Sequence, residues 1–204
     1  ATYSLTTLFW VFVKDYKYFL KKDLGPYKDR KHPPVEVFSC IASKILYYGY
    51  TLLLPMVLLP LPWWQVGIGF VAMHLTAGFL LGIVFQLAHV VEGPDHPVPD
   101  TQGHVDQPWY VHEMETTSNF ARGNRALSWY VGGLNFQVEH HLFPKVCSVH
   151  YPAISRIVEE VARKHGVPYH AQPTFRAAVA SHYRMLRELG RRPSPAMSTE
   201  PATA

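Results

Sequence analysis

The chain has 204 residues, of which 48% are hydrophobic, 14% aromatic and only 17% charged. Its formal net charge is +4, but no basic recognition motif accompanies that charge, which argues against nucleic acid as a partner. The two cysteines, Cys40 and Cys147, form no C-x-x-C spacing, so a cysteine-based metal site is excluded as well.

The chain opens with an apolar and aromatic stretch from Thr2 to Leu20, which ends at Lys21 and Lys22. Two interpretations are open: the cytoplasmic end of an earlier membrane helix, or a helix lying in the membrane interface. We favour the first, and we expect a proline-containing loop from Gly25 to Pro34 to follow it.

The central segment is free of charge. No Asp, Glu, Lys or Arg occurs from Ile45 to Val91, and about 20 apolar residues suffice to cross a bilayer as a helix. The prolines and tryptophans of Leu59–Trp64 predict a turn at the headgroup level. We therefore expect two spans, Ile45–Leu59 and Gln65–Val91. The alternative is a buried helical hairpin in a large soluble protein.

The basic residues before the first span predict its orientation. Positive charge stays on the cytoplasmic side, and the turn between the spans carries none. Both ends of the hairpin, and residues 92–190 after it, are therefore expected in the cytoplasm. The basic residues concerned are Lys14, Lys17, Lys21, Lys22, Lys28, Arg30, Lys31 and Lys44.

After the second span the sequence becomes polar and proline-rich, which predicts a loop over 92–100 and a short helix from Trp109 to Asn119. Apolar residues at helical spacing predict an amphipathic helix over Pro152–His165, ended by Gly166. A second is expected over Phe175–Leu189, with Thr174 as its N-cap. Residues 191–204 are expected to form a disordered tail. The fold class expected is all-α.

A histidine pair stands out in the segment 135–144, N-F-Q-V-E-H-H-L-F-P. On a helix Gln137 shares a face with His140 and His141, because residues three and four apart are neighbours. Adjacent imidazoles suit iron, zinc, copper or nickel, so spacing alone leaves the metal open. The competing interpretation is a pair of surface histidines at a helix end.

The string Q-V-E-H-H-L-F-P resembles the third histidine box of the membrane fatty acid desaturases, in the front-end form where glutamine replaces the first histidine. The neighbouring strings W-Y-V-G-G-L-N-F, K-V-C-S-V-H-Y-P and F-Q-L-A-H-V-V-E are similar to the same family. The resemblance implies the C-terminal part of a multi-pass helical membrane enzyme, with a helical cap on the cytoplasmic side. It also implies a di-iron centre that desaturates an acyl chain with O₂ and two electrons.

His89 is expected to be an iron ligand on this resemblance, and it also lies at the cytoplasmic end of the second span. His112 could be a ligand or could lie just behind the ligands, and Gln137 is a weak oxygen ligand at most. His74 lies about 22 Å from His89 along a helix, so it cannot share a centre with it. Packing or a buried hydrogen bond is the better interpretation of His74.

The family's first two histidine boxes do not occur in this sequence. His89, His140 and His141 are too few for two irons, so we expect a truncated product or partial sequence, inactive alone.

Implied partners are an acyl-CoA or acyl-lipid substrate, membrane lipid and a separate cytochrome b5- or ferredoxin-like electron donor. The implied location is the bacterial inner membrane or the endoplasmic reticulum. Open alternatives are a histidine-box lipid hydroxylase, and a non-catalytic membrane remnant that binds lipid or a partner. A haem cytochrome fits poorly, because His74 and His89 lie at different depths of one span.

Overall fold

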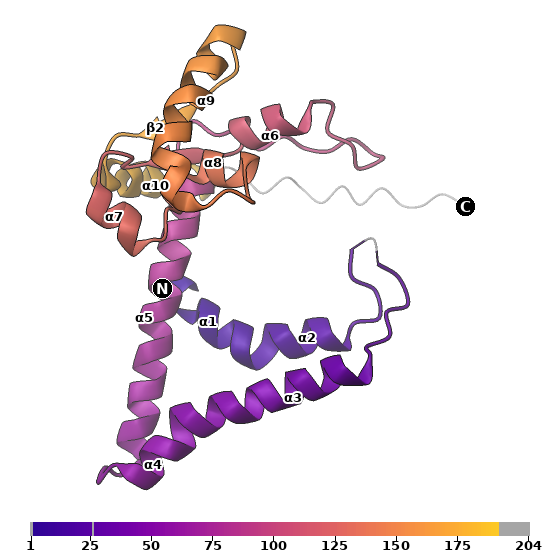
Figure 1. Ribbon diagram of the computed structural model, residues 1–204, viewed down its shortest axis with the longest axis vertical. Helices are drawn as coiled ribbons and strands as arrows, with labels where there is room; N and C mark the ends of the chain where they lie inside the picture. The colour runs from indigo at the N-terminus through magenta and orange to yellow at the C-terminus, as the bar shows by residue number, and fades with distance from the viewer. Residues whose placement is uncertain (1, 26, 192–204) are drawn as a thin grey trace. The chain divides into compact units, whose positions relative to one another are not determined.

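The computed structural model describes residues 2–25 and 27–191, and Figure 1 shows their helices and strands. The chain divides into two compact units, residues 1–83 and 84–204, and each unit is described by itself. Most of the described chain is helical, as expected. The predicted tail at 191–204 lies outside the described residues except for Arg191.

The first unit contains two helical segments before α5. The first runs through a 3₁₀ turn (Thr2–Leu5), α1 (Thr6–Phe9), a π-helical turn (Trp10–Lys14) and α2 (Asp15–Leu20). The second runs through α3 (Pro34–Tyr48), a π-helical turn (Gly49–Leu53) and α4 (Leu54–Leu58). The long helix α5 (Trp63–His89) follows, after a short turn that holds Pro60 and Pro62.

Two stretches among the described residues are long and apolar enough to cross a membrane, Pro34–Leu58 and Trp63–His89. Both differ from the predicted bounds. The first begins at Pro34 rather than Ile45, because proline suits the first helical turn and the helix continues through charged residues. One of these, Lys44, donates to Asp15 at 2.6 Å. The second ends at His89 rather than Val91.

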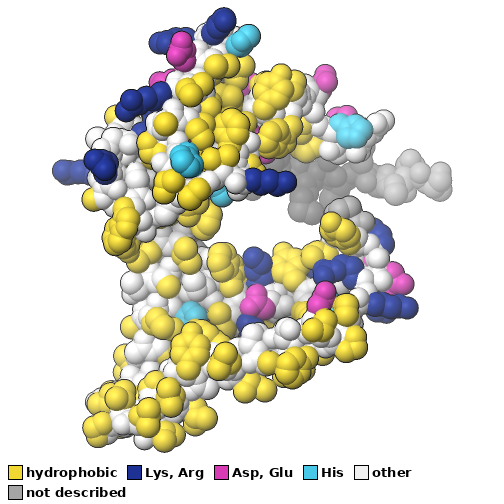
Figure 2. Space-filling view, viewed as in Figure 1, with side chains coloured by type: hydrophobic (Ala, Val, Ile, Leu, Met, Phe, Trp, Pro, Cys, Tyr) yellow, Lys and Arg dark blue, Asp and Glu magenta, His cyan; other side chains and the backbone are white. Residues whose placement is uncertain are grey.

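The outer surface of these helices is apolar. In the most apolar stretch of Pro34–Leu58 no residue is buried, and in that of Trp63–His89 only 17% are. Figure 2 shows hydrophobic side chains over α4, whereas the charged side chains of this unit gather around α2 and the loop after it. A core helix of a soluble protein would bury such side chains, so this exposure favours lipid as their surroundings.

His74 is held inside the first unit by hydrogen bonds, as predicted. Its Nδ1 lies 3.0 Å from Thr7 Oγ1, and its Nε2 lies 2.7 Å from Tyr47 Oη. Thr7 Oγ1 also donates to the His74 carbonyl at 2.8 Å. Both ring nitrogens are therefore occupied, which leaves this histidine without a free atom for a metal.

Within the described residues, the second unit holds six short or medium helices and a small sheet. The helices are α6 (Trp109–Glu115), α7 (Arg125–Tyr130), α8 (Gln137–Leu142), a 3₁₀ turn (Ser148–His150), α9 (Tyr151–His165) and α10 (Phe175–Leu189). Strands β1 (Ser118–Phe120) and β2 (His170–Gln172) pair in parallel, with Asn119 opposite Ala171. The all-α prediction is wrong in this detail. Three-residue strands carry too little periodicity to be seen, and the helix predicted over Trp109–Asn119 stops at Glu115.

The two amphipathic helices agree closely with their prediction. Gly166 ends α9 in the left-handed conformation (φ 69°), which glycine adopts without the penalty that a Cβ would add. Thr174 caps α10, its side chain accepting from Ala177 N at 3.1 Å. A small core of Met114, Val138 and Ala162 joins α6, α8 and α9, and Leu142, Val158, Val167 and Tyr169 pack against it. Packing in this core positions α8 against α6 and α9.

Candidate metal site

Two of the predicted ligands come together in the second unit. His89 is the last residue of α5, and His141 lies in α8. Their ring centroids are 5.2 Å apart, and the centroids of His140 and His141 are 5.8 Å apart. The end of the second predicted span therefore meets the histidine pair, although the two lie far apart along the chain.

Glu113 is a site residue that the sequence analysis missed. Its Oε2 lies 2.7 Å from His141 Nδ1, and both side chains are largely shielded from solvent. A carboxylate accepts, so Nδ1 carries the hydrogen and Nε2 is left as the free ligand atom. Metal-binding histidines generally present such a carboxylate or carbonyl to their second nitrogen. The signal in the sequence was weak, because Glu113 is one of two glutamates on the short helix α6 beside His112.

His89 has a similar but looser arrangement. Its Nδ1 lies 3.4 Å from the Thr116 carbonyl oxygen, which can only accept. Nε2 is therefore again the atom left for a metal. His140 is held differently: its ring centroid lies 6.5 Å from that of Tyr151. Burial lowers the pKa of His140, and His141 lowers it further, which favours the neutral imidazole that metals require.

Gln137 and His112 each present a polar atom without a partner. Gln137 is 1% exposed, and its Nε2 has no hydrogen-bond partner among the described residues. The same is true of His112 Nδ1. A buried polar atom left unpaired costs roughly 1–3 kcal/mol, so such atoms mark places where a partner is expected. Because amide oxygen and nitrogen are assigned from their surroundings, Gln137 can also present its oxygen.

The donor set fits iron in kind. Within residues 2–25 and 27–191, no group of three or more His, Cys, Asp or Glu side chains is arranged to hold a metal ion. His89, His140 and His141 are imidazoles, which suit iron, and the orphaned polar atoms of Gln137 and His112 lie on the same helices as the ligands or their partners. That the chain holds only part of a two-iron ligand set stays a prediction.

Helix α10 holds the chain just after His89, which the sequence analysis did not foresee. His182 Nδ1 lies 2.6 Å from the Val90 carbonyl oxygen, and Ser181 Oγ accepts from Glu92 N at 2.9 Å. Arg184 Nε donates to Glu92 Oε1 at 2.8 Å, and this hydrogen bond holds the pKa of Glu92 below its ordinary value. These contacts fix Val90 and Glu92, which directly follow the end of α5 at His89.

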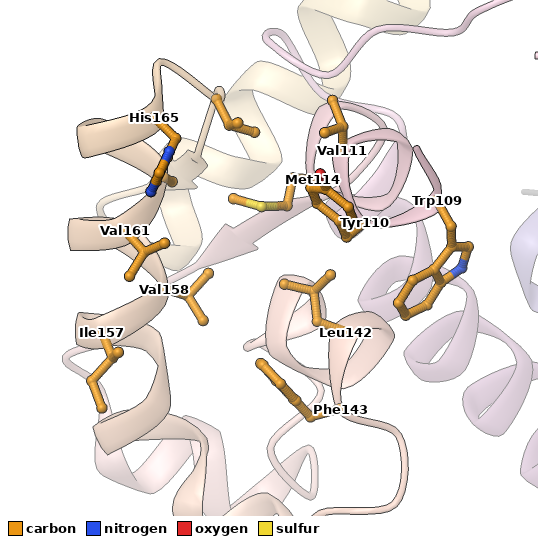
Figure 3. Close-up of a pocket in the computed structure, with 12 residues that line it drawn as sticks. Trp109, Tyr110, Val111, Met114, Leu142, Phe143, Ile157, Val158, Val161 and His165 are labelled. Carbon is orange, nitrogen blue, oxygen red and sulfur yellow. The ribbon is translucent and has the colours of Figure 1, made fainter. Parts of the chain in front are cut away.

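An apolar pocket of about 700 Å³ lies on the α9 side of α8 (Figure 3). Met114 from α6, Leu142 and Phe143 at the end of α8, and Val158 and Val161 from α9 face into it, while His165 lies at its edge. Its volume falls within the range of small-molecule sites. The lining suits hydrocarbon and offers little to a charged metabolite.

Comparison with known proteins identifies the family of the chain. The chain matches the family model "Fatty acid desaturase" over residues 1–173. It is 40% identical over 181 residues to sn-1 linoleoyl-lipid 6-desaturase of Synechocystis sp., covering 86% of this chain and 50% of that protein. It is 37% identical over 194 residues to acyl-lipid (8-3)-desaturase of Physcomitrium patens, covering 92% and 39%. The chain thus spans half or less of the length of these curated relatives, and no solved structure matches it. The chain belongs to the fatty acid desaturase family.

Proposed function

We propose that this chain forms the third-histidine-box part of a front-end, O₂-dependent desaturase that acts on acyl groups of membrane lipids. The observation that carries the proposal is the meeting of His89, His141 and Glu113, in which each histidine keeps Nε2 free. The relatives named as linoleoyl-lipid and acyl-lipid desaturases support a lipid-bound acyl group over acyl-CoA.

His89, His140 and His141 would hold iron, with Gln137 and His112 close behind them. Bound iron would supply the O₂-derived oxidant that an unactivated C–H bond requires, since such hydrogens are too weakly acidic for side-chain bases. Glu113 and the Thr116 carbonyl orient the two facing imidazoles. Electrons would come from a cytochrome b5- or ferredoxin-like protein. Three histidines do not complete two irons, so the remaining ligands would come from sequence equivalent to the first two histidine boxes.

The arrangement in the membrane follows from charge. We infer a multi-pass protein in which both ends of the hairpin, and the cap formed by residues 92–190, lie in the cytoplasm. Basic residues flank only that side, and the turn around Leu61 is uncharged. The membrane would be the bacterial inner membrane or the endoplasmic reticulum.

A cysteine introduced at Leu61 is expected to react with an impermeant thiol reagent from the opposite side to one introduced at Gly103. Both positions are exposed, so access is set by the membrane rather than by packing. Cys40 and Cys147 are first replaced by serine, and labelling is compared in intact and in permeabilised cells. Labelling of both positions from the same side would contradict the topology.

The desaturase activity is tested by the appearance of a new unsaturated fatty acid. The chain is joined to the half of the Synechocystis relative that lies outside the match, which we infer to be its N-terminal half, and is expressed in a host that lacks the product. A new double bond in membrane lipid fatty acids, seen by gas chromatography with mass spectrometry, is the expected result. A hydroxylated fatty acid would favour the lipid hydroxylase instead. Neither product, from a fusion that binds iron, would favour a non-catalytic lipid- or partner-binding role.

A further inference from the structure

Helix α8 carries His140 and His141 but cannot hold itself in place. It has six residues, and the residue before it, Phe136, provides no side-chain cap. Isolated helices shorter than about 12 residues are marginal in water. The direction in which the two imidazoles point must therefore be set by contacts from other elements.

Asn119, Glu139 and Tyr169 form a buried clamp on this helix. Asn119 Oδ1 accepts from Val138 N at 3.0 Å, which supplies the missing cap from strand β1. Asn119 Nδ2 donates to Glu139 Oε2 at 2.8 Å and to Tyr169 Oη at 2.7 Å. Tyr169 Oη donates to Glu139 Oε1 at 2.8 Å. Asn119 and Glu139 are fully buried, and each polar atom of the Asn119 amide has a partner.

The clamp is anchored by the sheet and by one ion pair. Tyr169 immediately precedes β2, whose pairing with β1 places Asn119 opposite Ala171. Arg122 Nη1 donates to Tyr169 Oη at 3.2 Å and to Glu159 Oε2 of α9 at 2.8 Å. Because Tyr169 Oη receives donors from Asn119 and Arg122, its own hydrogen is directed to Glu139. Burial raises the pKa of Tyr169, so that hydrogen stays in place at neutral pH.

The clamp lies on the side of α8 away from His141. An α-helix turns about 100° per residue, so Glu139 lies about 200° from His141 and about 100° from His140. Hydrogen bonds to two separate points, the Val138 amide and the Glu139 carboxyl, prevent rotation of the helix about its axis. We propose that Asn119, Glu139 and Tyr169 are positioning residues that set the direction of the His140 and His141 imidazoles toward the metal. This inference rests on the proposed metal role of the pair.

The test exchanges donor and acceptor between two buried partners. Asn119→Asp alone places two carboxylates face to face. Glu139→Gln alone makes the new amide NH₂ group face a donor, either the Asn119 amide or the Tyr169 hydroxyl. In the double variant, the carboxylate now at position 119 would still accept from Val138 N and would also accept from the new amide at position 139. The oxygen of that amide would accept from Tyr169, so the hydrogen bond from Asn119 Nδ2 to Tyr169 Oη is the one contact that the exchange does not restore. The net charge is unchanged. Tag-free 204-residue chain in detergent micelles is titrated with Co²⁺, whose absorption reports binding, and circular dichroism follows its unfolding. A single ion requires no more than the three imidazoles of this chain, so an unaltered chain that binds no Co²⁺ would refute the metal role of the pair and with it the clamp.

Each single variant is expected to lower Co²⁺ affinity about tenfold or more, the usual range for groups that hold metal ligands. The double variant should return it to within about threefold, because contacting partners are strongly non-additive. Phe120→Leu is the matched control: it removes buried volume from β1 without touching the clamp, so it should lower the melting temperature and leave Co²⁺ affinity unchanged.

Folded single variants that bind Co²⁺ like the unaltered chain would overturn the clamp, as would a double variant that regains nothing. If the single variants do not fold, Tyr169→Phe removes one hydroxyl only, and unchanged affinity in that variant would be equally decisive. His141→Ala separates the two proposals. Undiminished binding in His141→Ala would refute the metal role, whereas reduced binding there with normal binding in the clamp variants would refute only the clamp.

Discussion

Alanine at His140 or at His141 is expected to abolish desaturation in the fusion with the Synechocystis N-terminal half, while membrane insertion is retained. In the proposed site, loss of either imidazole would remove a metal ligand. Glu113→Gln should have an intermediate effect, about 10- to 100-fold, because it leaves the ligand in place but removes the charge that orients it. Product is measured by gas chromatography and iron by metal analysis of the purified fusion.

His104→Ala is the control for this series. His104 is exposed in the loop before α6, and loss of such a side chain usually changes stability by no more than about 0.5 kcal/mol. Its product yield and iron content should equal those of the unaltered fusion. Full activity in both His140→Ala and His141→Ala would leave the pair as surface histidines at a helix end.

The 204-residue chain expressed alone is expected to enter membranes and to form no new double bond. The reason is ligand number: the three proposed imidazole ligands would be too few to complete a two-iron centre. Ligands borrowed from a second molecule would have to overcome the cost of association. The measurement is fatty acid analysis of a host that lacks the product, with membrane fractionation to verify insertion.

Complementation by a separately expressed N-terminal half tests whether the chain lacks only the missing ligands. Co-expression of the chain with a separate N-terminal half of the Synechocystis relative should restore product, and the same half with alanine at the histidines of its expected histidine boxes should not. A double bond formed by the 204 residues alone would show that the ligand count is wrong. Failure of the fusion as well as of the two separate halves would count against a catalytic role for this chain.

Local sequence patterns predicted most of the helices. The charge-free segment indicated two apolar helices, and helical spacing with Gly166 and Thr174 located α9 and α10 closely. The helix that contains the first predicted span begins before Ile45, at Pro34, and Lys44 in its added part pairs with Asp15. The resemblance of residues 137–144 to a histidine box led to the family, which the comparisons confirm.

The sequence by itself determined the apolar helices, the amphipathic pair and the residue types able to bind a metal, because these depend on spacing along one chain segment. Only the tertiary structure decided which groups contact those histidines and the segments that carry them. Glu113 reaches His141, α10 fastens the chain after His89, and Asn119 caps a helix from a strand too short to be recognised. Each of these is a hydrogen bond between segments distant in sequence, and its partner is selected by the packing of the core.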